Sequence, residues 1–188
     1  MQNKLRFLLV ICLFFSSAAQ AFSISSIKFP EDHNVHKEAE VWKFSGKLQT
    51  EEGAKYAYVF QLSKKEDIIK VSTHVTDLIS KKEALNYHIE QGNVSGKKDK
   101  TIQWEAGKAF MRYNLIGDSW TFGVDDEKNG FNFRVKSVSP YVLNSKKSYS
   151  AKNMSINGNL TLDGKAIFVT GKDTVFEHCW GCGSLALR

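Results

Sequence analysis

The stretch KYAYVFQLS, residues 55–63, alternates large apolar side chains with smaller or polar ones. Successive side chains of an extended strand point to opposite faces, so Tyr56, Tyr58, Phe60 and Leu62 lie together on one face. Strict alternation of this kind is typical of a strand with one face buried and the other in water. The stretch therefore predicts a half-buried β-strand.

The same two-residue period recurs along the chain. FNFRVKSV, residues 131–138, places Phe131, Phe133 and Val135 on the face opposite three polar or charged residues. The turn signals that separate such runs are Glu52-Gly53, Asn129-Gly130, Asn157-Gly158 and Asp163-Gly164. Only SKKEALNYHI, residues 80–89, favours a short helical turn. About ten strands at this spacing predict an all-β sandwich or barrel.

The first 21 residues, MQNKLRFLLVICLFFSSAAQA, have the layout of a secretory signal peptide. Lys4 and Arg6 form a short cationic start, an apolar run follows, and Ala19-Gln20-Ala21 is a small-x-small cleavage site. The apolar run is too short for a membrane span. We expect cleavage near Ala21, which leaves residues 22–188 as one secreted or periplasmic domain.

The chain is basic, with a formal net charge of +6. Loss of Lys4 and Arg6 with the signal peptide lowers the charge of the mature chain to +4. Basic pairs lie in loop-like stretches at Lys64-Lys65, Lys81-Lys82, Lys97-Lys98 and Lys146-Lys147. They suit either peripheral contact with an anionic membrane surface or, as the pattern favours, solvated loops. Export and scattered charge argue against nucleic acid as a partner.

Near the end of the chain, FEHCWGCG spans residues 176–183. In an extended strand Phe176, His178 and Trp180 share one face, while Glu177 and Cys179 point the other way. The aromatic–His–aromatic stripe is suited to line an apolar pocket, where a tryptophan face can stabilise a cation. It is equally suited to fill a core, with His178 making an internal hydrogen bond. The sequence leaves both interpretations open.

The two cysteines of this motif have several conceivable roles. A haem anchor needs a histidine after Cys182, where Gly183 stands, and zinc needs more ligands than the stretch offers. Exported cysteines are normally paired, but a fully extended Cys-x-x-Cys holds its Cα atoms about 10 Å apart, beyond disulfide reach. We therefore predict a turn at Gly181 and a structural Cys179–Cys182 disulfide, with a redox-active pair as the alternative.

A second polar motif, Asp32-His33-x-x-His36, lies before the first strand. It resembles a metal-binding pair or a catalytic dyad, but no cysteine or fixed carboxylate partner stands nearby. The other interpretation is a loop whose Asp and His hydrogen bonds hold the first strand. The sequence thus predicts no metal and no other cofactor.

Two stretches at opposite ends of the mature chain resemble one family. FPEDHNVHKEAEVWKFSGKLQTEEGAKYAYVFQL is similar to the opening of the lipocalin-like carotenoid 1,2-hydratase family, which includes AttH-type secreted proteins. The matching residues are Phe29, Pro30, Asp32, His33, Glu40, Trp42, Gly46 and Gly53. SYSAKNMSINGNLTLDGKAIFVTGKDTVFEHCWG is similar to the end of the family's first domain. Its matching residues are Tyr149, Ser150, Gly158, Leu160, Gly164, Gly171, His178, Trp180 and Gly181. Val41 and Lys43 depart from the pattern.

The resemblance implies a lipocalin-like barrel with His178 and Trp180 at a reaction cavity. It also places the presumed catalytic acid in a second domain that this sequence lacks, so we expect hydratase activity to be absent or very weak. If the chain is nevertheless an enzyme, the expected catalytic residues are His178, Trp180 and Asp32, with Glu177 as another candidate acid. A homodimer could bring a second barrel beside the site.

Together these observations predict an exported, single-domain, lipocalin-like antiparallel β-barrel of about ten strands. It is expected to bind an apolar small molecule, such as a lipid or isoprenoid, in its interior. The expected lining residues are Trp42, Tyr58, Phe60, Trp104, Trp120, Phe133, His178 and Trp180. The alternatives are a hydratase- or isomerase-type enzyme of the same family, and a scaffold or interaction barrel filled by its own side chains.

Overall fold

The computed structural model describes residues 36–92, 97–98 and 101–182. The predicted signal peptide and the motif residues Asp32 and His33 therefore lie outside the described residues. Within these ranges the chain forms strands and turns and no helix, so it contains no helix that is long and apolar enough to cross a membrane.

Twelve strands follow one another along the described part of the chain. They are β1 (Glu40–Thr50), β2 (Lys55–Lys65), β3 (Ile68–Asp77), β4 (Glu83–Gly92), β5 (Lys97–Lys98), β6 (Thr101–Ala106), β7 (Ala109–Asn114), β8 (Ser119–Val124), β9 (Gly130–Lys136), β10 (Val142–Ser145), β11 (Ser148–Leu162) and β12 (Lys165–Trp180). Ten of them form a nearly closed antiparallel barrel, and the short β5 and β10 are additions to it. The prediction of an all-β barrel of about ten strands is confirmed.

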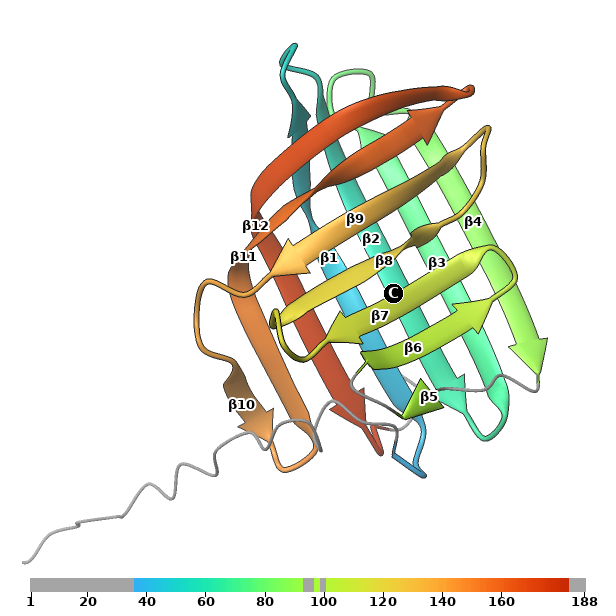
Figure 1. The fold of residues 1–188 in the computed structure, drawn as a ribbon, viewed down its shortest axis with the longest axis vertical. Helices are drawn as coiled ribbons and strands as arrows, with labels where there is room; N and C mark the ends of the chain where they lie inside the picture. Colours follow the sequence, from blue (N-terminus) through green and yellow to red (C-terminus); the bar gives the residue numbers. More distant parts are fainter. Residues whose placement is uncertain (1–35, 93–96, 99–100, 183–188) are drawn as a thin grey trace, which may run out of the picture.

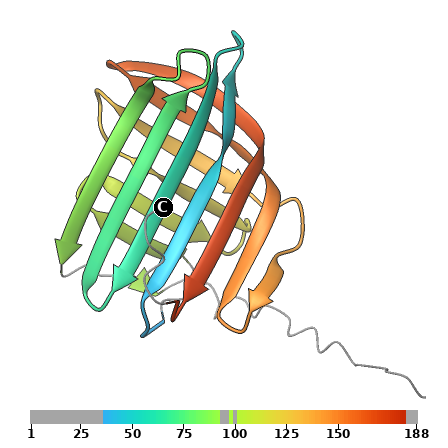
Figure 2. The same ribbon diagram turned by 180° about the vertical axis from the view of Figure 1, so that it is seen from behind.

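The barrel is a single sheet that curls over on itself. Its hydrogen-bonded order is β4-β3-β2-β1-β12-β11-β9-β8-β7-β6-β5, and β10 pairs with β11. Figures 1 and 2 show two layers, with β1–β4 in one and β6–β9 in the other. The long strands β11 and β12 bend and belong to both layers, so they join them along one side.

On the other side β4 and the β6–β7 pair approach without ladder pairing among the described residues. Side chains bridge this seam. The backbone N–H of Gly107 donates to Gln91 Oε1 at 2.7 Å, and that of Lys108 donates to the hydroxyl of Tyr87 at 3.0 Å. Each otherwise unpaired backbone donor thus finds an acceptor on β4.

The burial pattern follows the alternation seen in the sequence. In β2 the buried side chains are Tyr56, Tyr58, Phe60 and Leu62. In β9 the alternate residues Phe131, Phe133 and Val135 are likewise buried. Each large side chain removed from water contributes about 1.5–3 kcal/mol, so these inward faces drive the barrel together.

Three of the four turn signals mark turns, and the fourth does not. Glu52-Gly53, Asn129-Gly130 and Asp163-Gly164 lie at or beside the connections between strands. Asn157-Gly158 lies inside β11, where Gly158 is paired with Phe133 and Val169. A Cβ on Gly158 would lie 2.0 Å from the carbonyl oxygen of Asn132, so the glycine permits close approach of two strands. The short helical turn expected over residues 80–89 is wrong, because residues 83–92 form strand β4 and the turn before it covers only residues 78–80.

Candidate functional site

All eight residues predicted to line a ligand cavity point into the barrel interior. They are Trp42, Tyr58, Phe60, Trp104, Trp120, Phe133, His178 and Trp180, and none is more than 7% exposed. A side chain beside an open cavity would keep accessible surface, so these side chains pack against one another. Phe44 shows how dense the packing is, with ring centroids 4.3 Å from Phe122 and 4.7 Å from Phe176.

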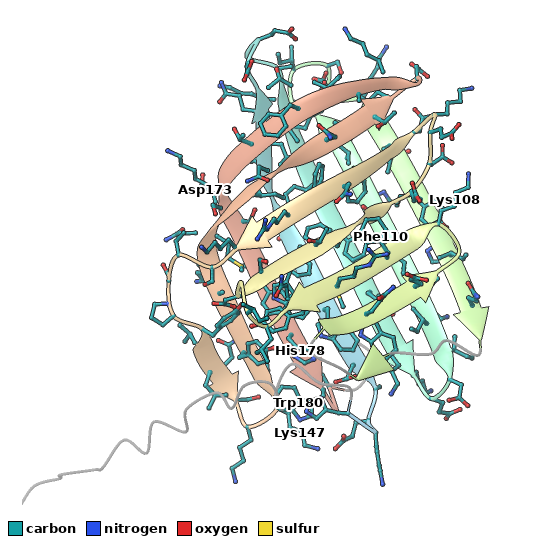
Figure 3. All side chains as sticks on the ribbon, viewed as in Figure 1. Lys108, Phe110, Lys147, Asp173, His178 and Trp180 are labelled. Atoms are coloured by element: carbon teal, nitrogen blue, oxygen red, sulfur yellow. A yellow bond between two sulfur atoms is a disulfide. The ribbon has the colours of Figure 1, made fainter. Side chains whose placement is uncertain are left out.

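A surface groove lies elsewhere. It has a volume of about 730 Å³ and is lined mainly by exposed residues of β1, β2 and β12, including Lys47, Phe168 and Lys172. None of the eight predicted lining residues borders it. Figure 3 shows the neighbouring Asp173 toward one end of the barrel and His178 and Trp180 toward the other.

At the His178 end, three polar residues meet inside the aromatic core. Glu40 begins β1 and His178 lies near the end of β12, and the antiparallel register pairs Trp42 with His178 and Glu40 with Trp180. Glu40 Oε1 accepts a hydrogen bond from the backbone N–H of His36 at 3.0 Å and contacts the His36 ring at Nδ1. The same oxygen lies 3.5 Å from His178 Nε2.

Glu40 is a buried carboxylate. Burial alone would raise the pKa of Glu40, but hydrogen bonds from His178 and His36 and the charge of His178 outweigh it. The pKa of Glu40 therefore lies below its ordinary value, and the group is ionised at neutral pH. The side chains of Glu40 and His178 are fully buried, and that of His36 is 21% exposed.

Aromatic rings fix the two imidazoles. The His178 ring stacks on the Trp42 ring, with centroids 4.9 Å apart, and makes an edge contact with the Tyr149 ring, with centroids 5.1 Å apart. His36 stacks almost parallel on Trp180, with centroids 4.3 Å apart. A tryptophan face attracts a cation, so the setting favours a positive charge near Glu40.

Three buried polar atoms in this region have no hydrogen-bond partner among the described residues. They are Glu40 Oε2, Trp42 Nε1 and Trp104 Nε1. The ring centroids of Trp104 and Trp42 are 5.7 Å apart, and Trp42 in turn stacks on His178. Trp104, Trp42 and His178 therefore form one continuous group of packed rings. A buried polar group without a partner costs about 1–3 kcal/mol, so the cluster is suited to hydrogen-bond a guest.

The segment before β1 covers this end of the barrel and is held at three points. Lys64 Nζ donates to the carbonyl of His36 at 2.9 Å, and Lys147 Nζ pairs with Glu38 at 3.0 Å. The backbone N–H of Gly181 donates to the carbonyl of Ala39 at 2.8 Å. Residues 36–39 therefore form a cover, and His36 is its inner side chain.

The predicted Cys179–Cys182 disulfide is confirmed, with Cα atoms 6.1 Å apart. The turn at Gly181 is also present, and Gly181 has a positive φ of 64°. The bridge ends β12 and encloses Trp180, the residue on which His36 stacks. A disulfide is consistent with the predicted oxidising compartment.

Neither of the two candidate acids named from the sequence, Asp32 and Glu177, is found at the site among the described residues. Asp32 lies outside the described residues. Glu177 is wrong as a site residue, because its side chain is 54% exposed and pairs with Lys43 at 3.5 Å. Successive side chains of a strand point to opposite faces, so Glu177, next to the buried His178, lies on the outer face of β12. The carboxylate that sequence reasoning missed is Glu40, and a signal was available, since Glu40 shares its strand face with Trp42 and Phe44.

Comparison with known proteins shows similarity at the level of the fold. No protein-family model matches the chain, and no curated protein matches it. Among solved structures, an AttH-like protein from Nitrosomonas europaea superposes with a TM-score of 0.68 at 15% identity over 90% of this chain. Kievitone hydratase from Nectria haematococca superposes with a TM-score of 0.67 at 10% identity over 83% of this chain.

The chain spans 60% of the length of the first of these structures and 52% of the second. At such low sequence identity, the superposition shows that the folds are similar and nothing more. The expected resemblance is thereby confirmed for architecture: the chain has the lipocalin-like fold of AttH-type proteins and of kievitone hydratase.

Proposed function

We propose that the protein binds an apolar small molecule that carries a polar group. The observation that supports this is a set of buried polar atoms that have no hydrogen-bond partner among the described residues, Glu40 Oε2, Trp42 Nε1 and Trp104 Nε1. Trp42 and Trp104 belong to the aromatic interior, which provides apolar contact for the body of a ligand. A hydroxyl group satisfies both types of atom, because it donates to the carboxylate and accepts from an indole N–H.

Entry at the covered end requires the least rearrangement. Among His36, Glu40 and His178, His36 is the one with a partly exposed side chain. It contacts Trp180 by ring stacking and not by strand pairing. Because the interior is filled, a ligand must displace side chains as it enters, and the cover formed by residues 36–39 must move first. Binding is therefore expected to be slow compared with entry into an open barrel.

The test uses the untagged mature protein and three probes: a long-chain fatty alcohol, a polyprenyl alcohol and a carotenoid. Tryptophan fluorescence and native mass spectrometry should show saturable binding of one molecule per chain to at least one probe. Trp104→Phe keeps an aromatic side chain, though a smaller one, and removes the indole donor, so it should weaken binding of the alcohols severalfold. Gln103→Ala, on the same strand, is the matched control. No saturable binding to any probe would overturn the proposal.

A second candidate function is acid–base catalysis, and the 3.5 Å separation of Glu40 and His178 favours it. Addition of water to an alkene needs a proton donor, a group that stabilises the carbocation, and a placed water molecule. A protonated His178 held by Glu40 could give its proton to one carbon of the alkene. Water would then add to the other carbon and return a proton to the neutral imidazole of His178. Turnover of an acyclic isoprenoid alkene that falls by about 10²–10⁴ in His178→Gln would establish this function.

A further inference from the structure

The His36, Glu40 and His178 side chains have the composition of a metal centre. The ligand-type atoms of these three residues all lie within 4.8 Å of one another. Two imidazoles and one carboxylate are the protein ligands of a common class of catalytic zinc site, which leaves the fourth position open. We infer that this cluster is a binding site for a divalent late-transition cation, for which Zn²⁺ is the natural probe. The inference goes beyond the proposed function. The two share the Glu40 carboxylate, and the experiment below distinguishes them.

Part of the required geometry is already present. Zinc lies about 2.0–2.1 Å from its nitrogen and oxygen ligands, so two ligand atoms of a tetrahedral site are about 3.3 Å apart. Glu40 Oε1 and His178 Nε2 are separated by 3.5 Å. The His178 ring cannot turn easily, because it lies between the face of Trp42 and the edge of Tyr149. Two of the three ligands are therefore held near the required spacing by the packing of the core.

The third ligand is the adjustable one. His36 Nδ1 is in hydrogen-bond contact with Glu40 Oε1, so an ion must replace the shared proton and move the ring outward. His36 lies before β1 and is partly exposed, so such a shift breaks no strand pairing. The same partial exposure provides a route for the ion.

A second observation points to a ligand at this site. Glu40 Oε2 is fully buried and has no hydrogen-bond partner among the described residues. A cation bound by Glu40 would draw on this oxygen as well, either directly or through a water on the open position. Cys179 and Cys182 are joined to each other, so their thiolates do not compete for the ion.

The chemistry of the ligands also selects the type of ion. Imidazole suits zinc, copper and nickel, whereas calcium and magnesium prefer all-oxygen sites. The carboxylate leaves a bound divalent ion with a net charge of +1 in an apolar setting. This charge favours an anionic fourth ligand, such as hydroxide or a carboxylate.

The experiment uses the untagged mature chain, treated with chelator and then dialysed, without reductant so that the disulfide stays closed. Calorimetric titration with Zn²⁺ should show one ion per chain, and Co²⁺ should give the strong visible absorption of a tetrahedral site. His36→Ala and Glu40→Gln should each weaken Zn²⁺ binding by about 100-fold or more. Mg²⁺ should not compete.

The chain provides a matched control in the exposed pair His74–Glu83, whose Nδ1 and Oε2 atoms are 3.4 Å apart. His74→Ala should leave Zn²⁺ binding unchanged. His36→Ala is the decisive variant because His36 lies outside the strands, and its fold can be verified by circular dichroism. Absence of stoichiometric Zn²⁺ binding, or equal affinity in wild type and His36→Ala, would overturn the inference. Binding of the apolar probes in the presence of chelator tests the proposed function separately.

Discussion

Gly158 lies inside β11, between β9 and β12, at a point where an added side chain would overlap the backbone of β9. Its φ is +154°, and a Cβ would lie 2.0 Å from the carbonyl oxygen of Asn132 and 2.9 Å from the Cα of Phe133. Both obstacles are backbone atoms, so no side-chain rotation can relieve the overlap. The residue at this position is therefore fixed by the spacing of the strands.

We predict that Gly158→Ala lowers the free energy of unfolding by about 3 kcal/mol or more, the combined effect of overpacking and backbone strain. Gly53→Ala is the control, because Gly53 also has a positive φ but nothing lies within 4 Å of its added Cβ. In Gly53→Ala the free energy of unfolding should fall by only about 1–2 kcal/mol. Urea unfolding measures both, and equal losses would show that the close approach is unimportant.

At the scale of single residues, the sequence predicted correctly which side chains face the interior, because the alternation along a strand determines this. The eight predicted lining residues all face inward, because the two-residue period alone sets the side of a strand. The same period places Glu177 outside and Glu40 inside. The sequence could not show that Glu40 meets His178, because that contact depends on the pairing of the first strand with the last.

Strands β11 and β12 are the elements that give the barrel its shape. They run for 15 and 16 residues, and their ladder contains register shifts between Ala151 and Ile156. Such irregularities bend strands and increase their twist, which is how one pair can serve both layers. The sequence predicted a turn at Asn157-Gly158 because an Asn-Gly pair in a hairpin and a glycine at a close strand contact look alike.

The end of β12 depends on its disulfide, which closes a ring of only four residues. We predict that Cys179→Ser/Cys182→Ser lowers the free energy of unfolding by about 2 kcal/mol, since a short ring restricts the unfolded chain only modestly. Reductant should lower wild-type stability by a similar amount and leave the double variant unchanged. Denaturant titrations with and without reductant make both measurements.

Thiol counting provides the independent control for this prediction. Alkylation followed by intact-mass measurement should find no free thiol in protein purified from an oxidising compartment. Two free thiols would contradict the structural role of the bridge. Ready exchange with a partner dithiol would instead support the redox-active alternative.

For the whole molecule, the fold class was predictable and the filling of the interior was not. Alternating strands and turn signals indicate an all-β sandwich or barrel from local pattern alone, and the family resemblance favoured the barrel. Whether aromatic side chains line a cavity or fill it depends on how their volumes add across both layers. Phe44 of β1 and Phe122 of β8 come from opposite layers, and their stacking follows from closure of the barrel.

Closure itself is completed at the seam between β4 and the β6–β7 turn. There the backbone N–H groups of Gly107 and Lys108 donate to Gln91 Oε1 and the Tyr87 hydroxyl. These two bonds replace a strand ladder, so the seam should be the first part of the wall to open. Each hydrogen bond contributes about 0.5–1.5 kcal/mol to stability.

We predict that Tyr87→Phe/Gln91→Leu opens the seam while the rest of the barrel stays folded. The amides of Gly107 and Lys108 should exchange with solvent about tenfold faster or more, because each loses its acceptor, which shifts local opening by about 1.4 kcal/mol. Amides of β1 and β12, which pair with each other over most of their length, should keep their protection because their ladder is untouched. Hydrogen exchange followed by NMR resolves these sites. Gln103→Leu on β6 is the control, because among the described residues its side chain hydrogen-bonds to the Glu105 side chain of the same strand. Unchanged exchange at Gly107 and Lys108 in the double variant would mean that packing, not these two hydrogen bonds, closes the barrel.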